Sequence, residues 1–168
     1  MLELLLFLVP VYIANSSPVV LGGGAPLDFN IKLGDGRRLF GSGKTIRGFA
    51  GGILAGTLAG GLVALFYQLP FFPDQGTQLT AAFLLSIGTL VGDAMGSFLK
   101  RRLGMESGKQ FMPDTFIFLL VAMVFVFPVA DASLYGPFNL AFFLILTVIL
   151  HPLTNVLANR LGLKKVPW

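Results

Sequence analysis

Asp93 is the side chain best suited to chemistry in this sequence, because it stands inside an apolar segment. It lies in the run GDAMGS of residues 92–97, and Ser97 follows one helical turn later. A carboxylate at membrane depth is costly and by default marks a functional site. A second carboxylate, Asp114, comes directly after Pro113. Two carboxylates at neighbouring helix ends suit a hard divalent cation such as Mg²⁺, so we predict a metal site at Asp93 and Asp114.

A purely structural role is the alternative for both acids. Asp93 would then pair with Arg47 or Lys100, and Asp114 would cap the helix that follows it.

A glycine-rich basic segment lies between the first two apolar stretches. Residues 34–48 read GDGRRLFGSGKTIRG. Its glycines expose backbone N–H groups and its bases supply positive charge, a combination that suits phosphate. A helix is expected to begin where the run ends, and a helix N-terminus also favours an anion. We predict a phosphate-binding loop with the candidate residues Arg37, Arg38, Ser42, Lys44, Thr45 and Arg47.

The run GSGKT is similar to half of a P-loop, but the match fails. The P-loop pattern requires glycine where Arg38 stands, and no βαβ unit surrounds the run. A loop whose charges only set the membrane orientation, with glycines at its turns, is the alternative to a phosphate site.

A second basic segment, residues 97–109, follows Asp93. It contributes Ser97, Lys100, Arg101 and Lys109 as candidate ligands of substrate phosphates. Acids for a metal, bases for phosphates and a membrane setting together predict the transfer of a phosphate-containing group at the cytoplasmic interface.

Polar residues also interrupt the first and last apolar stretches. Asn15 lies between Pro10 and Pro18, and either bonds a neighbouring helix or lines a polar pocket. His151, Asn155 and Asn159 recur every four residues, which places them on one helix face. Lipid would not tolerate such a stripe, so we expect Asn155 to line the same pocket as Asn15.

The composition identifies the elements that position these residues as membrane helices. Of 168 residues, 55% are hydrophobic and only 12% are charged, about half the charged fraction of soluble proteins. These values exclude a soluble enzyme, a disordered chain and a nucleic-acid-binding domain. The sequence has no Cys and one His, which excludes disulfides, thiolate sites and a His-rich metal centre.

We therefore predict an all-α integral membrane protein, a single catalytic domain over residues 1–168. Five apolar stretches of bilayer-spanning length occupy residues 4–21, 48–69, 79–99, 116–130 and 138–158. Glycines recur every four residues in the second and third stretches, as they do where membrane helices pack closely.

The charges predict the orientation of these helices. All 12 Lys and Arg lie between stretches one and two, between stretches three and four, or after stretch five, whereas the other connections hold only acids. The positive-inside rule therefore places the N-terminus outside, and the C-terminus and both long basic loops in the cytoplasm of a multi-pass protein of the cell membrane.

Over nearly its whole length the chain resembles the archaeal CDP-archaeol synthase family. The resemblance rests on Asn15 with Pro18, on GDGRR and GSGKTIRG, on Gly92-Asp93 with Ser97, Lys100 and Arg101, on Pro113-Asp114, and on His151-Pro152 with Asn155. The bacterial CDP-diacylglycerol synthases are similar only around residues 92–114, and the Gly-His-Gly-Gly run of the bacterial enzymes is missing after Pro113.

The resemblance implies a cytidylyltransferase that converts CTP and an unsaturated archaetidic acid, an isoprenoid ether lipid phosphate, into a CDP-lipid and pyrophosphate with Mg²⁺. Asp93, Asp114, Lys100 and Arg101 would be catalytic. The lipid tails would stay in a groove open to the membrane lipids.

Two other functions fit parts of the sequence. A small polytopic acyltransferase would also have Gly-Ser-Gly loops, but it needs no intramembrane acid such as Asp93. A transporter subunit would be expected to show inverted repeats, which are not visible here.

Overall fold

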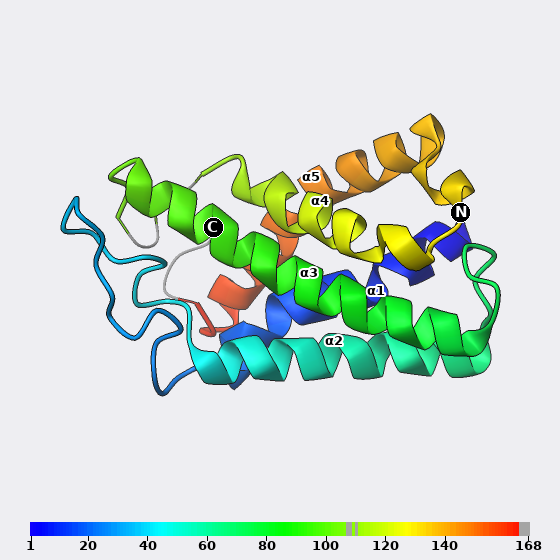
Figure 1. The fold of residues 1–168 in the computed structure, drawn as a ribbon, viewed down its shortest axis with the longest axis horizontal. Helices are drawn as coiled ribbons and strands as arrows, with labels where there is room; N and C mark the ends of the chain where they lie inside the picture. Colours follow the sequence, from blue (N-terminus) through cyan, green and yellow to red (C-terminus); the bar gives the residue numbers. More distant parts are fainter. Residues whose placement is uncertain (107–108, 110, 165–168) are drawn as a thin grey trace.

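The computed structural model describes residues 1–106, 109 and 111–164. The described part contains five α-helices: α1 (Leu2–Leu21), α2 (Ile46–Phe66), α3 (Gln75–Arg102), α4 (Asp114–Val126) and α5 (Pro137–Arg160). Two short 3₁₀ helices, η1 (Phe127–Val129) and η2 (Ala132–Tyr135), join α4 to α5. The helices lie side by side along the long axis of the molecule (Figure 1), as the sequence predicts.

The connections alternate between the two ends of the bundle (Figure 1). The α1–α2 connection, the α3–α4 connection and the C-terminal end of α5 share one end, which we call the basic end. The N-terminus and the other two connections share the opposite end. This is the alternation that the charge pattern predicts, although one predicted cytoplasmic base, Lys165, lies outside the described residues.

The prediction of five membrane-spanning helices needs a refinement at α4. Among the described residues, four helices are long and apolar enough to cross a membrane: α1, α2, α3 and α5. The fourth apolar stretch forms a shorter helical segment, Asp114–Val129. Its α-helical part, α4, begins after Pro113 and ends at Val126, two residues before Pro128. Proline lacks the N–H that an α-helix interior needs.

The glycine stripes pack the helices closely, as predicted. On α2, a Cβ added at Gly52 would lie 2.9 Å from the carbonyl oxygen of Ala14 in α1. On α3, a Cβ added at Gly92 would lie 2.6 Å from the Cα of Phe118 in α4. Only glycine permits these approaches, and they bring the acids of α3 and α4 to the same place.

Aromatic packing closes the end opposite the basic end. The aromatics of this packing include two from the α2–α3 connection. Phe71 and Phe72 are buried, and their ring centroids lie 6.1 Å and 6.3 Å from that of Phe7. Buried aromatic rings contribute a large apolar area to such packing.

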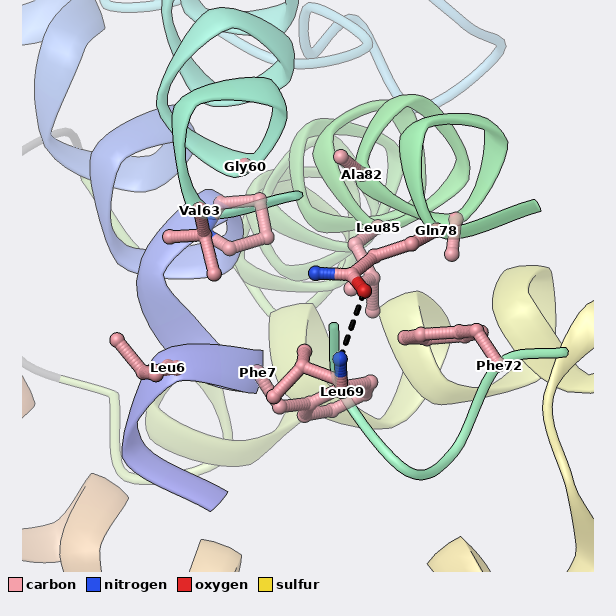
Figure 2. Close-up of a pocket in the computed structure, with 11 residues that line it drawn as sticks. Leu6, Phe7, Gly60, Val63, Leu69, Phe72, Gln78, Ala82 and Leu85 are labelled. Atoms are coloured by element: carbon pink, nitrogen blue, oxygen red, sulfur yellow. Dashed lines mark hydrogen bonds between the residues drawn. The ribbon is translucent and has the colours of Figure 1, made fainter. Parts of the chain in front are cut away.

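A small gap remains in this packing, among residues of α1, α2, α3 and the α2–α3 connection (Figure 2). Its volume is about 10 Å³, which is room for roughly one water molecule. The backbone N–H of Leu69 donates to Oε1 of Gln78 at 2.8 Å, and Nε2 of Gln78 donates to the carbonyl of Tyr67 at 3.0 Å. Gln78 thus satisfies the backbone of the connection, and the gap is a packing feature.

Candidate active site

A cavity of about 530 Å³ opens at the basic end, and it gathers residues from α1, α3, α4, α5 and both basic connections. Nine of the predicted site residues line it: Asn15, Lys44, Asp93, Ser97, Lys100, Arg101, Lys109, Asp114 and Asn155. These residues are up to 140 positions apart in the sequence, so the helix packing alone brings them together.

The cavity is strongly cationic. Five basic side chains line it (Lys44, Lys100, Arg101, Lys109 and Lys164), against the two carboxylates of Asp93 and Asp114, which leaves a net charge of +3. A cleft lined mainly by one sign of charge concentrates ligands of the opposite sign. The cavity is therefore suited to polyanions such as phosphates.

Asp93 forms an ion pair with Lys44. Lys44 directly precedes Thr45, the N-cap residue of α2. The hydroxyl oxygen of Thr45 accepts from the backbone N–H of Gly48 at 3.1 Å and of Gly23 at 3.2 Å. Thr45 thus fixes the start of α2 and, with it, the position of Lys44. The structural alternative named Arg47 or Lys100 as the partner of Asp93, and neither is its ion-pair partner here.

Asp114 forms the corresponding ion pair with Lys100. Pro113 is the N-cap residue of α4, and Asp114 is its first helical residue, so the predicted capping role is not the one observed. Its other carboxylate oxygen, Oδ1, is buried and has no hydrogen-bond partner among the described residues. An unpaired buried carboxylate oxygen is costly, and a bound cation would relieve that cost.

The residues present fit Mg²⁺ as a partial ligand set. Two carboxylates line one cavity, and no group of three His, Cys, Asp or Glu side chains occurs in the part of the chain that the structure describes. Mg²⁺ is commonly held by one or two carboxylates while substrate phosphates and water complete its oxygen shell.

Sequence reasoning misses Asp28, which organises the α1–α2 connection. Its side chain is buried and pairs with Arg38, whose Nε donates to Oδ2 at 3.1 Å. The backbone N–H groups of Phe40 and Gly41 also donate to Oδ2, at 3.2 Å and 3.1 Å. The hydrogen bond from the Arg38 guanidinium is the largest cause that holds the pKa of Asp28 well below its usual range, and the backbone bonds add to it. A lone acid in a basic loop carries no periodic signal that would have identified it.

Arg37 and Arg102 tie the same loop to the end of α3. Nη1 of Arg37 donates to the carbonyl of Arg102 at 3.2 Å, and Arg102 pairs with Asp35 at 2.8 Å. The structure therefore uses Arg37 and Arg38 as cross-links in the loop. Neither lines the cavity, and the same holds for the predicted ligands Ser42, Thr45 and Arg47.

Two polar positions on α1 and α5 flank the cavity as predicted. Asn15 and Asn155 both line it, and Oδ1 of Asn155 accepts from Nζ of Lys164 at 2.8 Å. His151 lines it too, and its ring stacks on Phe118 with centroids 5.3 Å apart. Lys164 is predicted from the sequence only as a cytoplasmic charge, and its return to the cavity is a tertiary effect.

Comparison with known proteins places the chain among membrane-lipid enzymes. A family model described as "CarS-like: CDP-archaeol synthase" matches residues 1–168. The CDP-archaeol synthase of Pyrococcus horikoshii is 45% identical over 100% of this chain and 97% of its own length. That of Archaeoglobus fulgidus is 41% identical, and the match covers 100% of both chains.

A solved structure agrees with the fold. It is described as "Structural insight into an intramembrane enzyme for archaeal membrane lipids biosynthesis" and matches with a TM-score of 0.79 at 35% identity. The match covers 93% of this chain and 94% of the other. The resemblance noted in the sequence is thus confirmed along nearly the full length of the bundle.

Proposed function

The chain belongs to the CDP-archaeol synthase family, and from this premise we propose how the cavity at its basic end performs the reaction. The protein is a CTP-dependent cytidylyltransferase of archaeal membrane lipid biosynthesis, and a multi-pass membrane protein. The acyltransferase and transporter alternatives are set aside by this membership. The observation that carries the site proposal is the convergence of two carboxylates and five cations in one cavity.

The proposed substrates are CTP and an unsaturated archaetidic acid. An oxygen of the lipid phosphate attacks the α-phosphorus of CTP, a new P–O bond forms, and the bond from that phosphorus to the β-phosphate oxygen breaks. Pyrophosphate leaves with the electron pair of that bond. The lipid phosphate is already an anion, so the step needs no general base, in agreement with a cavity that holds one His.

The barrier to this step is electrostatic, because two anions must meet and charge builds on the departing pyrophosphate. Fixed cations lower both contributions. Lys100 and Arg101, on the last turn of α3, and Lys44, before α2, face the cavity from two sides. We assign these three side chains, with Lys109, to the phosphates of CTP.

The ion pairs of the substrate-free site have a role in this assignment. Lys44 and Lys100 neutralise Asp93 and Asp114 in the absence of substrate. When the phosphates of CTP enter, each ammonium can turn from its carboxylate to a phosphate oxygen. Asp93 and Asp114 would hold Mg²⁺, which supplies charge stabilisation at the transferred and leaving phosphates. Ser97, Asn15 and Asn155 offer neutral donors and acceptors around the ligand.

The orientation and the single-domain organisation belong to the same proposal. The basic end faces the cytoplasm, since the positive-inside rule favours it and CTP is a cytoplasmic metabolite. The cavity takes residues from both the beginning and the end of the chain, which supports one catalytic unit over residues 1–168.

The test is turnover by the purified protein. We expect radiolabelled CTP and the lipid phosphate to give pyrophosphate and a labelled lipid in equal amounts when Mg²⁺ is present. Omitting either the lipid or the metal should abolish both products. Pyrophosphate without a labelled lipid would indicate hydrolysis of CTP and would contradict the proposed transfer.

A further inference from the structure

The end of α5 returns Lys164 to the bundle through a defined backbone turn. Gly162 adopts a left-handed conformation with φ +73°. Its N–H donates to the carbonyl of Asn159 at 2.9 Å, and the N–H of Leu163 donates to that of Ala158 at 2.9 Å. This pair of bonds is a Schellman motif, which ends the helix and reverses the chain. Residues 163 and 164 are therefore held in place and do not trail away from the bundle.

The side chain of Lys164 is fixed at the same point. Its Nζ donates to Oδ1 of Asn155 at 2.8 Å, and its carbonyl accepts from Nδ2 of Asn159 at 2.9 Å. Lys164 is half-buried and lines the cationic cavity. Asn155 and Asn159, two residues of the polar stripe of α5, thus hold Lys164 in position.

A second cavity, of about 390 Å³, lies between α1 and α5 beside the first. The two helices touch near their middles, where the hydroxyl of Tyr12 donates to that of Thr147 at 2.9 Å. Toward the basic end they part, and we call the space between them the α1–α5 groove. It is lined by Asn15, Ser16, Ser17, Val19, Val20, Leu21, Thr154, Asn155, Ala158 and Leu163.

The walls of the groove are less polar than this composition suggests. The hydroxyls of Ser16, Ser17 and Thr154 donate within their own helices, to carbonyls three or four residues earlier. Such local bonds satisfy the donors and leave the aliphatic side chains to face the space. The groove is suited to hydrocarbon.

The groove and the cationic cavity meet beside Asn155, the hydrogen-bond partner of Lys164. Asn15, Val19 and Asn155 line both spaces. Leu163 lines the groove, while its neighbour Lys164 lines the cavity. One dipeptide therefore places an apolar side chain and a cation next to each other, in the order in which a phospholipid carries its chains and its phosphate.

We propose that Lys164 binds the phosphate of the lipid substrate at the junction of the two spaces, and that Asn155 positions its ammonium group. This inference rests on the proposed function and divides the cations between the substrates. Lys164 takes the lipid phosphate, while Lys109 and the bases on α3 and before α2 take CTP. The lipid chains lie in the α1–α5 groove, so the nucleophile reaches the cavity from the membrane side.

The electrostatics of the lysine support this role. Burial, together with the positive charges of Lys44 and Lys100, lowers the pKa of Lys164 below the usual range of lysine. These surroundings disfavour the charged ammonium, and a phosphate bound next to it would offset that cost.

The test compares the substitution Lys164→Met, which keeps the aliphatic stem and removes the charge, with Lys164→Arg, which keeps the charge. We expect Lys164→Met to raise the KM for the lipid phosphate about tenfold or more and to leave the KM for CTP within about twofold. Lys164→Arg should recover most of the loss. Lys32→Met, an exposed lysine of the α1–α2 connection, is the matched control and should change neither constant.

A binding measurement gives a second readout. Without CTP, a short-chain fluorescent ether lipid phosphate should bind the wild type and bind Lys164→Met more weakly, while binding of labelled CTP is equal in the two. If both affinities fall together, or if the lipid affinity is unchanged, the assignment of Lys164 is wrong. If the wild type itself neither binds nor converts the lipid phosphate, it is the proposed function that fails.

Discussion

Asp114 sits directly over Gly96, and a Cβ added at Gly96 would lie 2.4 Å from Oδ1 of Asp114. The absence of a side chain at Gly96 on α3 therefore leaves the space that the carboxylate of Asp114 on α4 occupies. An ordinary contact begins near 3.4 Å, so any larger residue at position 96 must push the carboxylate aside by about 1 Å.

The first prediction is that Gly96→Ala damages turnover more than stability. The clash involves the end of a side chain, which can move, and alanine favours a helix over glycine by about 1 kcal/mol. A displacement of roughly 1 Å at a reacting centre can cost about a hundredfold in rate. We expect kcat to fall roughly ten- to a hundredfold with a melting temperature close to that of the wild type.

Gly92→Ala is the matched control on the same face of α3. Its Cβ would meet the backbone of α4, at 2.6 Å from the Cα of Phe118 and 2.8 Å from the carbonyl of Ile117. Backbone cannot move aside cheaply, and overpacking of this kind costs about 1–3 kcal/mol. Gly92→Ala should therefore lower the melting temperature. If the two variants have equal melting temperatures and Gly92→Ala turns over more slowly than Gly96→Ala, the proposed role of Gly96 is contradicted.

The second prediction concerns the acids. Asp93→Asn keeps the shape of the side chain but removes the charge needed to hold Mg²⁺ beside anionic substrates. We expect the variant to fold, to insert and to lose nearly all cytidylyl transfer, with little recovery at higher Mg²⁺ concentration. Asp114→Asn should behave in the same way if the two carboxylates share the ion. Substantial activity of Asp93→Asn at ordinary Mg²⁺ concentration would reduce Asp93 to an ion-pair partner of Lys44.

The third prediction separates two bases of the same loop. Lys44 lines the cavity, whereas Arg38 is bonded to the buried Asp28. A hydrogen bond to a charged group contributes about 1.5–3 kcal/mol, so Lys44→Ala should raise the KM for CTP roughly tenfold or more. Arg38→Ala should instead make the α1–α2 connection more susceptible to proteolysis, together with any loss of activity. If the KM for CTP is unchanged in Lys44→Ala, Lys44 does not bind CTP and its charge serves only the membrane orientation.

The fourth prediction is a pH dependence of stability that comes from Asp28. Its pKa is lowered in the folded protein, so its bonds contribute fully above the ordinary aspartate range, near pH 4, and are lost as the pH falls below it. Asp28→Asn should cost about 3 kcal/mol at neutral pH, because Arg38 loses its carboxylate. Thermal unfolding of both proteins should show a constant difference from about pH 6 to about pH 4, and the difference should shrink steadily as the pH is lowered further, toward the folded-state pKa of Asp28. Parallel curves would exclude Asp28 as the source.

The fifth prediction is the membrane orientation. The sequence contains no Cys, so a single introduced thiol reports its own position. Thiols at Gln75 and Ala132 should react with an impermeant reagent from outside the cell, and those at Lys32 and Glu106 only after the membrane is opened. All four positions are exposed. The reverse pattern would overturn the proposed orientation.

The sequence by itself determined the class of the fold and the side of the molecule that carries the chemistry. Apolar length and the confinement of all 12 bases to three segments are properties of the chain that survive any packing. The stretch 138–158, for example, becomes α5 over Pro137–Arg160. The acids Asp93 and Asp114 could be found for the same reason, since a charge in an apolar run is visible without coordinates.

Only the tertiary structure decided which bases face the cavity. In the sequence, Arg38 and Lys44 are equivalent cations of one loop, yet Arg38 folds onto Asp28 and Lys44 reaches Asp93. In the sequence, Lys164 is one more positive charge after the last apolar stretch. In the structure, the left-handed Gly162 turns the chain so that Lys164 returns to the bundle. Ion pairing depends on distances of a few ångströms between elements far apart in the chain, and such distances are set by helix packing, which the linear order of residues does not encode locally.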